Sequence, residues 1–144
     1  DTRLDDYLPT GTFIDAQISN PLLQNIFEPN TPLHDGAVII RDGRIHYAAC
    51  VLPLFSDPTI SRELGTRHRA ALGVSNVSDS LTLVVSEETG VISYAENGKL
   101  VRYVDRIALT ELLETVFVSS TGDEKPLSFL FKSKKTASKG MKKK

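Results

Sequence analysis

Two Asx-Gly dipeptides, each set between strand-like segments, restrict the fold of this chain more than any other feature. Both are two-residue turn signals, because Asn, Asp and Gly tolerate the positive φ angles that tight β-hairpins need. They are Asp42-Gly43, between Ala37–Arg41 and Arg44–Leu54, and Asn97-Gly98, between Gly90–Ala95 and Lys99–Val104. The sequence therefore predicts two β-hairpins.

Three segments have helical signals. Ser19-Asn20-Pro21 predicts the start of a short helix through Phe27, because Ser or Asn can cap a helix and Pro suits its first turn. Thr66 is expected to cap a helix over Thr66–Val74. Asp105 is expected to cap a last helix over Ile107–Phe117, which carries an apolar stripe.

The order of these elements predicts the fold class. Leu81–Val85 is a continuous apolar run, so we expect a central strand there. The predicted elements then follow one another in the order helix, hairpin, helix, strand, hairpin and helix. This order indicates an α/β fold, with a mixed sheet flanked by helices in a single layered globular domain. A length of 144 residues suits one domain with one core.

Charge divides the chain into two parts. Residues 1–118 carry 9 Lys and Arg against 16 Asp and Glu, whereas residues 119–144 carry 8 Lys against 2 acidic residues. We expect residues 1–118 to form the domain and the Lys-rich residues 119–144 to form a mostly disordered tail. A solubilising role for this tail is favoured over contact with an anionic membrane or polymer. The acidic body argues against nucleic-acid binding, so any phosphate site needs a few well-placed cations.

Several classes of protein and site are disfavoured. No apolar run is long enough to cross a membrane, and there is no signal peptide, P-loop motif or Cys/His cluster for zinc. The single cysteine, Cys50, lies in the apolar run Tyr47–Leu54 and is expected in the core rather than as a reactive thiol. Because the sequence starts at Asp1 and not at Met, we expect a piece of a longer protein, whose upstream part could anchor it to a membrane.

Three polar segments stand at the ends of predicted elements, where loops on a rigid sheet commonly form sites. They are Leu33–Ala37, Leu64–Ala70 and Val85–Gly90. In the second segment, Gly65 and Thr66 precede a helical turn that holds Arg67, His68 and Arg69. Cations at a helix start oppose the helix dipole unless an anion lies among them. A phosphate site and a solvated basic turn are equally consistent with this spacing.

The other two segments offer carboxylates. Asp35 could orient or deprotonate a hydroxyl, His34 could bind a metal, and Gly36 would let a ligand approach the backbone. Glu87 and Glu88 offer hard oxygen ligands for magnesium or manganese beside phosphates. Taken alone, the first of these segments is better explained as an ordinary turn and the second as a charged loop. Together they contain the groups needed for phosphoryl or nucleotidyl transfer.

These motifs resemble those of the diadenylate cyclase domain, and most closely its membrane-linked bacterial branch. The resemblance runs from about Leu4 to Phe117 and is carried by Asp35-Gly36-Ala37, Arg67-His68-Arg69 and their surroundings. It implies an enzyme that condenses two ATP into cyclic di-AMP plus two pyrophosphate at a two-subunit interface. It also implies Mn²⁺ or Mg²⁺ as cofactor, and a cytoplasmic domain of a membrane-anchored protein.

The resemblance also implies roles for individual residues. Asp35, in the Asp35-Gly36 turn, would activate the 3′-hydroxyl, and the backbone of Leu52 would read the adenine edge. Position 51, where many relatives carry an aromatic residue that stacks on the base, is Val51, which bears on the strength of adenine binding. The metal would lie near His34, Glu87 and Glu88. The triphosphate would be held by Gly65, Thr66, Arg67, His68, Arg69, Ser86 and Glu87.

The expected product gives an independent reason for a second copy of the chain as partner. Cyclic di-AMP is two-fold symmetric, so the simplest catalyst is an isologous pair with one ATP in each half. Regulatory protein partners stay open, and a membrane would be reached only through segments missing from this chain. Relatives carry a strand and helix upstream of Asp1, so the N-terminal edge is expected to be incomplete. Two alternatives stay open: a non-catalytic nucleotide-binding module and a pure interaction domain.

Overall fold

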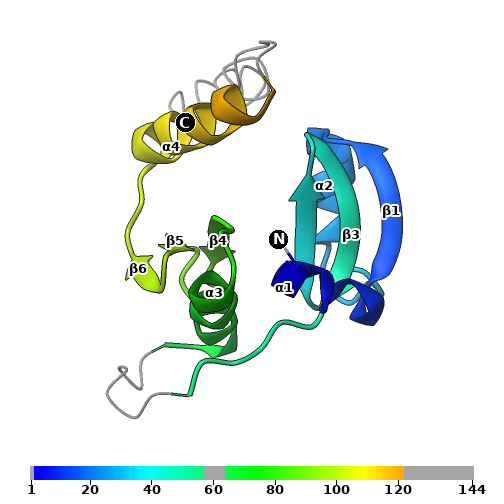
Figure 1. Cartoon of the computed structure of the whole chain (residues 1–144), viewed down its shortest axis with the longest axis horizontal. Helices are drawn as coiled ribbons and strands as arrows, with labels where there is room; N and C mark the ends of the chain where they lie inside the picture. The colour runs from blue at the N-terminus through cyan, green and yellow to red at the C-terminus, as the bar shows by residue number, and fades with distance from the viewer. Residues whose placement is uncertain (1, 57–63, 122–144) are drawn as a thin grey trace, which may run out of the picture.

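A computed structural model describes residues 2–56 and 64–121 of the chain (Figure 1). Its strands form two antiparallel sheets of three strands each, in the orders β1-β3-β2 and β4-β5-β6. The elements are α1 (Thr2–Asp5), the 3-10 helix η1 (Leu8–Thr10), β1 (Thr12–Gln17), α2 (Asn20–Ile26), β2 (Ala37–Arg41), β3 (Arg44–Cys50), α3 (Thr66–Val77), β4 (Thr82–Val85), β5 (Ile92–Glu96), β6 (Lys99–Val101) and α4 (Arg106–Thr121).

The predicted α/β class is confirmed, but the strands are divided between two sheets instead of forming one mixed sheet. Neighbouring strands joined by short loops pair antiparallel, whereas a parallel pair needs a long crossover connection. Every pairing in the described part of the chain is of the antiparallel kind.

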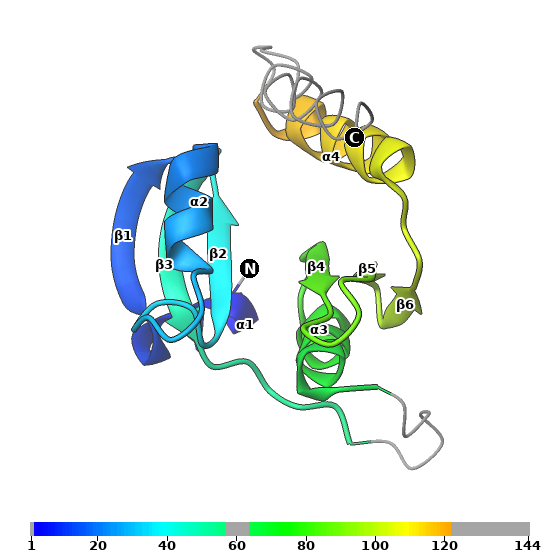
Figure 2. The ribbon, with the colours of Figure 1, turned by 180° about the vertical axis from the view of Figure 1, so that it is seen from behind.

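The first sheet is built on the predicted hairpin of β2 and β3. Asp42 and Gly43 have φ angles of 53° and 70°, as a two-residue hairpin turn requires. On the other side of β3 lies β1, a strand that the sequence did not predict. Figure 2 shows α2 across one face of this sheet, where Ile26, Ile45 and Ala48 form a core cluster.

Two local predictions in this half are confirmed. The Ser19 hydroxyl accepts a hydrogen bond of 3.3 Å from the Leu22 N–H, so Ser19 caps α2. Cys50 is 1% exposed and packs with Leu8 and Ile39 on the other face of the sheet. Burial raises the pKa of the Cys50 thiol, which favours the inert protonated form.

In the second sheet β5 is the central strand and β4 is an edge strand, so the predicted central position of Leu81–Val85 is wrong. Only Val84 of this strand is buried, at 4% exposure, and it packs with Ala71 of α3 and Ala95 of β5. Leu83 and Val85 point away from α3 and are 41% and 57% exposed. The apolar run therefore has one buried face, not two.

The two long helices differ from the predictions at their ends. Gly65 is the N-cap of α3, and Thr66 is its first residue rather than its cap. The predicted cap of α4 is confirmed, because the Ala108 N–H donates to Asp105 Oδ1 at 2.8 Å. This helix continues to Thr121, past the expected boundary at residue 118, and the rest of the expected tail lies outside the described residues. Within residues 2–56 and 64–121, the structure holds no helix of the length and apolar character that a membrane crossing requires.

Candidate functional site

An ion pair joins two of the three polar segments. Arg67 lies in the first turn of α3, and Glu87 lies in the loop between β4 and β5. Their Nη1 and Oε2 atoms are 2.6 Å apart, the distance of a charge-assisted hydrogen bond between two partly exposed side chains. The Arg67 hydrogen bond and positive charge hold the pKa of the Glu87 carboxyl below its ordinary value. Two segments twenty residues apart in the sequence therefore face each other.

The third polar segment has only an electrostatic link to this ion pair, through His34. The positive charge of the protonated His34 ring contributes to the lowered pKa of Glu87, after the larger effects of Arg67. Arg67 and Glu87 are in direct contact, whereas His34 is linked to Glu87 by a weak electrostatic attraction. The convergence of all three polar segments on one site therefore stays a prediction.

The orientation of His34 suits a ligand at its second nitrogen. Nδ1 of the ring lies 3.1 Å from the carbonyl oxygen of Thr31. A carbonyl only accepts hydrogen bonds, so Nδ1 carries the proton in the neutral ring and Nε2 keeps its lone pair. A histidine that donates from one nitrogen to a carbonyl is the usual arrangement beside a metal ion.

Asp35 and Gly36 form the turn that leads into β2. Asp35 is exposed. Gly36 has a φ of +134°, and a Cβ atom on it would lie 2.6 Å from the carbonyl carbon of Ala49 and 2.9 Å from the carbonyl oxygen of Cys50. Only glycine fits this conformation and this close approach. Gly36 therefore lies against the backbone at the end of β3, directly after Asp35 in the chain.

Leu52 lies at the same end of this strand pair. Ala37 pairs with Cys50, so Asp35 and Leu52 both stand two residues beyond that pair. Leu52 is half-buried, and the preceding Val51 is 64% exposed. The expected adenine-reading position and the expected hydroxyl-activating position therefore both follow the same end of the β2–β3 pair.

The loop that carries Glu87 is shaped by Ser86. Its hydroxyl accepts a hydrogen bond of 3.3 Å from the Thr89 N–H, and its carbonyl accepts one of 2.9 Å from the Gly90 N–H. Because a hydroxyl can accept and donate at once, the Ser86 O–H can still donate to a phosphate oxygen. Glu88 is exposed on the same loop.

The three basic residues at the start of α3 diverge. Arg67 faces Glu87, Arg69 is exposed, and His68 is turned inward at 5% exposure. Burial and the charge of Arg102 lower the pKa of His68, so this ring is neutral at neutral pH. The helix start thus presents two cations rather than three. Direct contact between His68 and a triphosphate stays a prediction.

Gly65 and Thr66 complete the helix start. Both are exposed, and no side chain caps the first turn at Gly65. The first N–H groups of a helix have no partner within the helix, so a phosphate can accept from them.

The described residues hold no group of three or more His, Cys, Asp or Glu side chains arranged to bind a metal. His34 and Glu87 are the candidates for one nitrogen and one carboxylate ligand. Mg²⁺ beside a nucleotide commonly uses one or two protein ligands, with phosphate oxygens and waters as the rest. A metal that arrives with a triphosphate stays a prediction for this site.

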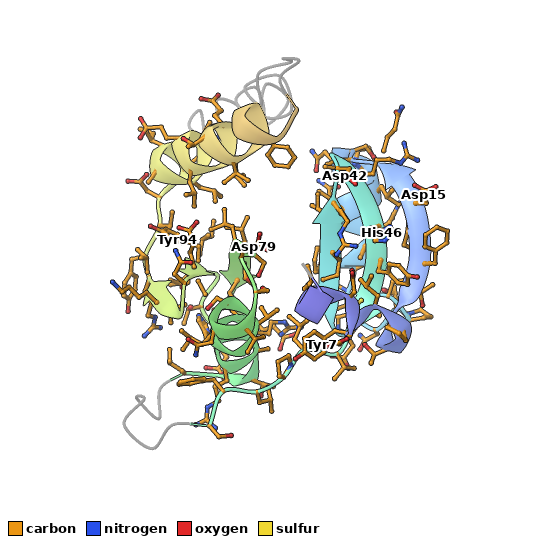
Figure 3. All side chains as sticks on the ribbon, viewed as in Figure 1. Tyr7, Asp15, Asp42, His46, Asp79 and Tyr94 are labelled. Atoms are coloured by element: carbon orange, nitrogen blue, oxygen red, sulfur yellow. The ribbon has the colours of Figure 1, made fainter. Side chains whose placement is uncertain are left out.

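Other features of the structure lie outside this group of residues. A hollow of about 400 Å³ between β5, β6 and α4 is lined by Tyr94, Arg102 and Leu112 among others, and by no residue of the three polar segments. The remaining histidine, His46 (Figure 3), packs edge-on against Tyr47 in the first sheet at 4.8 Å between ring centroids. We interpret His46 as a packing residue.

Comparison with protein families finds one model that covers most of the described chain. The family is described as DisA bacterial checkpoint controller nucleotide-binding, abbreviated DAC, and its model matches residues 1–100. All three polar segments fall within this range.

Two curated relatives are more than half identical in sequence. The chain is 53% identical over 135 residues to the cyclic di-AMP synthase CdaA of Bacillus subtilis, covering 94% of this chain and 50% of that protein. It is 55% identical over 129 residues to a diadenylate cyclase of Listeria monocytogenes, covering 90% of this chain and 47% of that protein. The chain thus spans about half the length of these relatives.

Solved structures agree with the fold. A crystal structure of a double mutant of DacA from Staphylococcus aureus matches with a TM-score of 0.72 at 50% identity, covering 81% of this chain and 75% of that one. A hypothetical membrane spanning protein from Bacillus cereus matches with a TM-score of 0.64 at 52% identity, covering 67% of this chain and 47% of that one.

Proposed function

Since the chain belongs to the DAC family of DisA-type nucleotide-binding domains, we propose that it is the catalytic domain of a diadenylate cyclase. Its reaction is the condensation of two ATP into cyclic di-AMP and two pyrophosphate. The observation that carries the proposal is the ion pair of Arg67 and Glu87, which joins two of the three polar segments.

The start of α3 binds the triphosphate in this proposal. The free N–H groups after Gly65 and the Thr66 hydroxyl face the phosphate oxygens, and Arg69 adds an exposed cation. The Arg67 side chain is 38% exposed and makes one contact with Glu87, so its other N–H groups can donate to a phosphate while the ion pair stays in place. Ser86 donates its hydroxyl hydrogen from the opposite loop.

Asp35 acts on the attacking group. Its carboxylate accepts the proton of the ribose 3′-hydroxyl while the 3′-oxygen forms a bond to the α-phosphorus of the other ATP. The bond between that phosphorus and the bridging oxygen of pyrophosphate breaks, and pyrophosphate leaves with the electron pair. Two such steps, one for each 3′-hydroxyl, close the ring. Gly36 fixes Asp35 in place by its contact with the backbone of Ala49.

Adenine binds at the neighbouring edge of the first sheet. The backbone of Leu52 reads the edge of the base, and the exposed Val51 covers its face. A valine offers apolar contact without the stacking of an aromatic ring. We expect Val51→Tyr to strengthen ATP binding severalfold.

His34, Glu87 and Glu88 are the residues that would hold Mn²⁺ or Mg²⁺ together with the phosphates. The His34 Nε2 lone pair and the Glu87 carboxylate would be the first two of these ligands. The ion, when bound, neutralises charge that develops on the transferring phosphoryl group.

A second copy of the chain completes the site. A single subunit exposes Asp35, Arg69 and Glu88 and presents one nucleotide, so it has no second α-phosphate within reach. Two copies that face each other bring each 3′-oxygen to about 3–3.5 Å from phosphorus, the separation that makes the reaction effectively unimolecular. Pairing is then the step on which regulatory proteins can act.

The domain is proposed to work on the cytoplasmic side of a membrane-anchored protein. The relatives are about twice as long as this chain, and one solved relative is described as membrane spanning. An anchor that holds copies in one plane would raise their effective concentration and favour pairing.

The proposal is tested by incubating the purified chain with ATP and Mn²⁺ and measuring cyclic di-AMP by mass spectrometry. Asp35→Asn should lower the rate by roughly 100-fold or more, because it removes the base but keeps the shape. Asp42→Asn is the matched control, since Asp42 lies in the turn at the other end of the same hairpin (Figure 3).

Three results would contradict the proposal in different ways. Product formation by Asp35→Asn at the wild-type rate would remove Asp35 from the chemistry. Binding of ATP without conversion would indicate a nucleotide-binding module. Absence of any thermal shift with ATP would indicate an interaction domain, because a ligand at a hundredfold excess over its Kd stabilises a protein by about 2.7 kcal/mol.

A further inference from the structure

A buried polar contact lies directly beneath the proposed phosphate site. His68 is 5% exposed and Ser93, on β5, is completely buried. The Nε2 atom of His68 lies 3.5 Å from the Ser93 hydroxyl oxygen. A buried serine and a buried histidine each lose their hydrogen bonds to water, so a hydrogen bond between the two side chains offsets that cost.

The position of this contact links the two loops of the site. His68 follows Arg67 directly, so the ring is attached to the same helical turn that carries the ion pair. Ser93 pairs with Val84, which stands three residues before Glu87. The contact therefore joins the first turn of α3, which carries Arg67, to the β4–β5 hairpin, whose loop carries Glu87.

The surrounding residues favour a single, neutral state of the ring. His68, Ala71, Leu72 and Ser75 form the buried face of α3 against the sheet. Arg102, just after β6, disfavours a positive charge on His68. Its Nε atom is buried and makes no hydrogen bond with any atom in the described part of the chain. A neutral ring can exchange one hydrogen bond with a hydroxyl without a buried charge.

We infer that Ser93 is a positioning residue for the nucleotide site. Through the His68 ring it fixes the first turn of α3 against the loop between β4 and β5, so that Arg67 stands opposite Glu87 before a nucleotide binds. The consequence for nucleotide binding rests on the proposed function, whereas the contact itself does not. Ser93 touches no substrate in this account and is not a catalytic residue.

The chain offers a matched control in Ser75. This serine is also buried, at 2% exposure, and also lies between α3 and the second sheet. Its hydroxyl donates to the Leu72 carbonyl at 3.0 Å and accepts from the Gly98 N–H at 3.2 Å. Ser75→Ala thus removes a buried hydroxyl from the same interface, two helical turns away from His68.

The test compares Ser93→Ala with Ser75→Ala by two measurements. The ¹⁵N signals of the His68 ring are recorded without nucleotide, and the affinity for a non-hydrolysable ATP analogue with Mn²⁺ is measured by calorimetry. Ser93→Ala is expected to shift the His68 Nε2 signal and to weaken binding roughly threefold to tenfold, the effect of one lost hydrogen bond. Ser75→Ala is expected to lower stability while it leaves both readouts unchanged.

The inference is overturned if Ser93→Ala leaves the His68 signal or the affinity unchanged, or if Ser75→Ala weakens binding as much. If Ser93→Ala does not fold, Ser93→Cys takes its place, since a thiol of similar size is a weak hydrogen-bond partner. A wild-type protein that binds no nucleotide would refute the proposed function. The His68 signal would still show separately whether Ser93 holds the ring.

Discussion

Replacement of Gly36 by alanine tests how the turn that carries Asp35 is held. The new Cβ atom would lie 2.6 Å from the Ala49 carbonyl carbon, 2.8 Å from the Ala49 Cα atom and 2.9 Å from the Cys50 carbonyl oxygen. All three are backbone atoms of the adjoining strand, so no flexible side chain can move aside. The φ angle of +134° is also one that L residues rarely adopt.

Both effects contribute to the expected loss of stability. A strained backbone conformation costs about 1–3 kcal/mol, and overpacking at a site that cannot relax costs about 1–3 kcal/mol more. We expect Gly36→Ala to lower the free energy of unfolding by about 4 kcal/mol. In Gly43→Ala, in the turn of the same hairpin, the new Cβ atom would lie within 4 Å of no other atom. The positive φ of +70° is then the source of strain. Its expected cost is about 1–2 kcal/mol.

Urea denaturation of the two variants measures this difference. Alanine restricts the unfolded chain equally in both, so that contribution cancels in the comparison. Gly36→Ala should also lose cyclic di-AMP synthesis, because any shift that relieves the clash moves Asp35, whereas Gly43→Ala should stay active. Equal stabilities of the two variants would refute the proposed close approach. An active, stable Gly36→Ala would show that Asp35 needs no such support.

Further predictions concern Arg67, Glu87 and His34. Arg67→Gln should weaken ATP binding roughly 10- to 100-fold by calorimetry, as expected for the loss of hydrogen bonds to a charged group. The control, Arg44→Gln, loses only an exposed ion pair with Asp15 and should bind ATP within about twofold of wild type. The pKa of Glu87 should be lower than 4.5 in a ¹³C NMR titration. The ion pair with Arg67 is then complete above pH 4.5 and is lost only as the pH falls through the lowered pKa. A Glu87 pKa at its ordinary value would contradict the ion pair. The neutral His34 ring should show a protonated Nδ1 and an unprotonated Nε2 by ¹⁵N NMR. Added Mn²⁺ with nucleotide should broaden the signals of this ring. The opposite tautomer would contradict the role of His34 as a ligand.

Local sequence signals predicted the elements whose ends depend on local chemistry. The turn at Asp42-Gly43 and the caps at Ser19 and Asp105 each act within a few residues, so the sequence is enough to locate them. The prediction that Thr66 caps α3 is wrong, because the preceding residue Gly65 has the extended conformation that a cap needs, with a ψ of 176°.

Features that depend on tertiary contacts were missed or misplaced. The apolar run of β4 suggested burial on both faces, but only Val84 meets α3. The first strand, β1, has a register shift between Phe13 and Ala16 and an exposed Phe13, so its alternation gave no clear strand signal. The buried Ser93 had one detectable signal, a polar residue on the same face of its strand as Ala95, but its partner His68 lies on a different element.

The candidate site was predictable as a set of residue types but not as an arrangement. Asp35, Arg67 and Glu87 each had an ordinary structural explanation from sequence alone. Their relation depends on how α3 and the β4–β5 loop pack and on where the His34 ring lies, and no local pattern contains that information.

The central claim, that three segments meet at one nucleotide, is tested most directly by paramagnetic relaxation. Mn²⁺ bound with a non-hydrolysable ATP analogue should broaden the amide signals of His34, Arg67 and Glu87 together. The signal of Asp42, at the far end of the hairpin from Asp35, should keep its intensity. Broadening of only one of the three segments, or equal broadening at Asp42, would contradict the account.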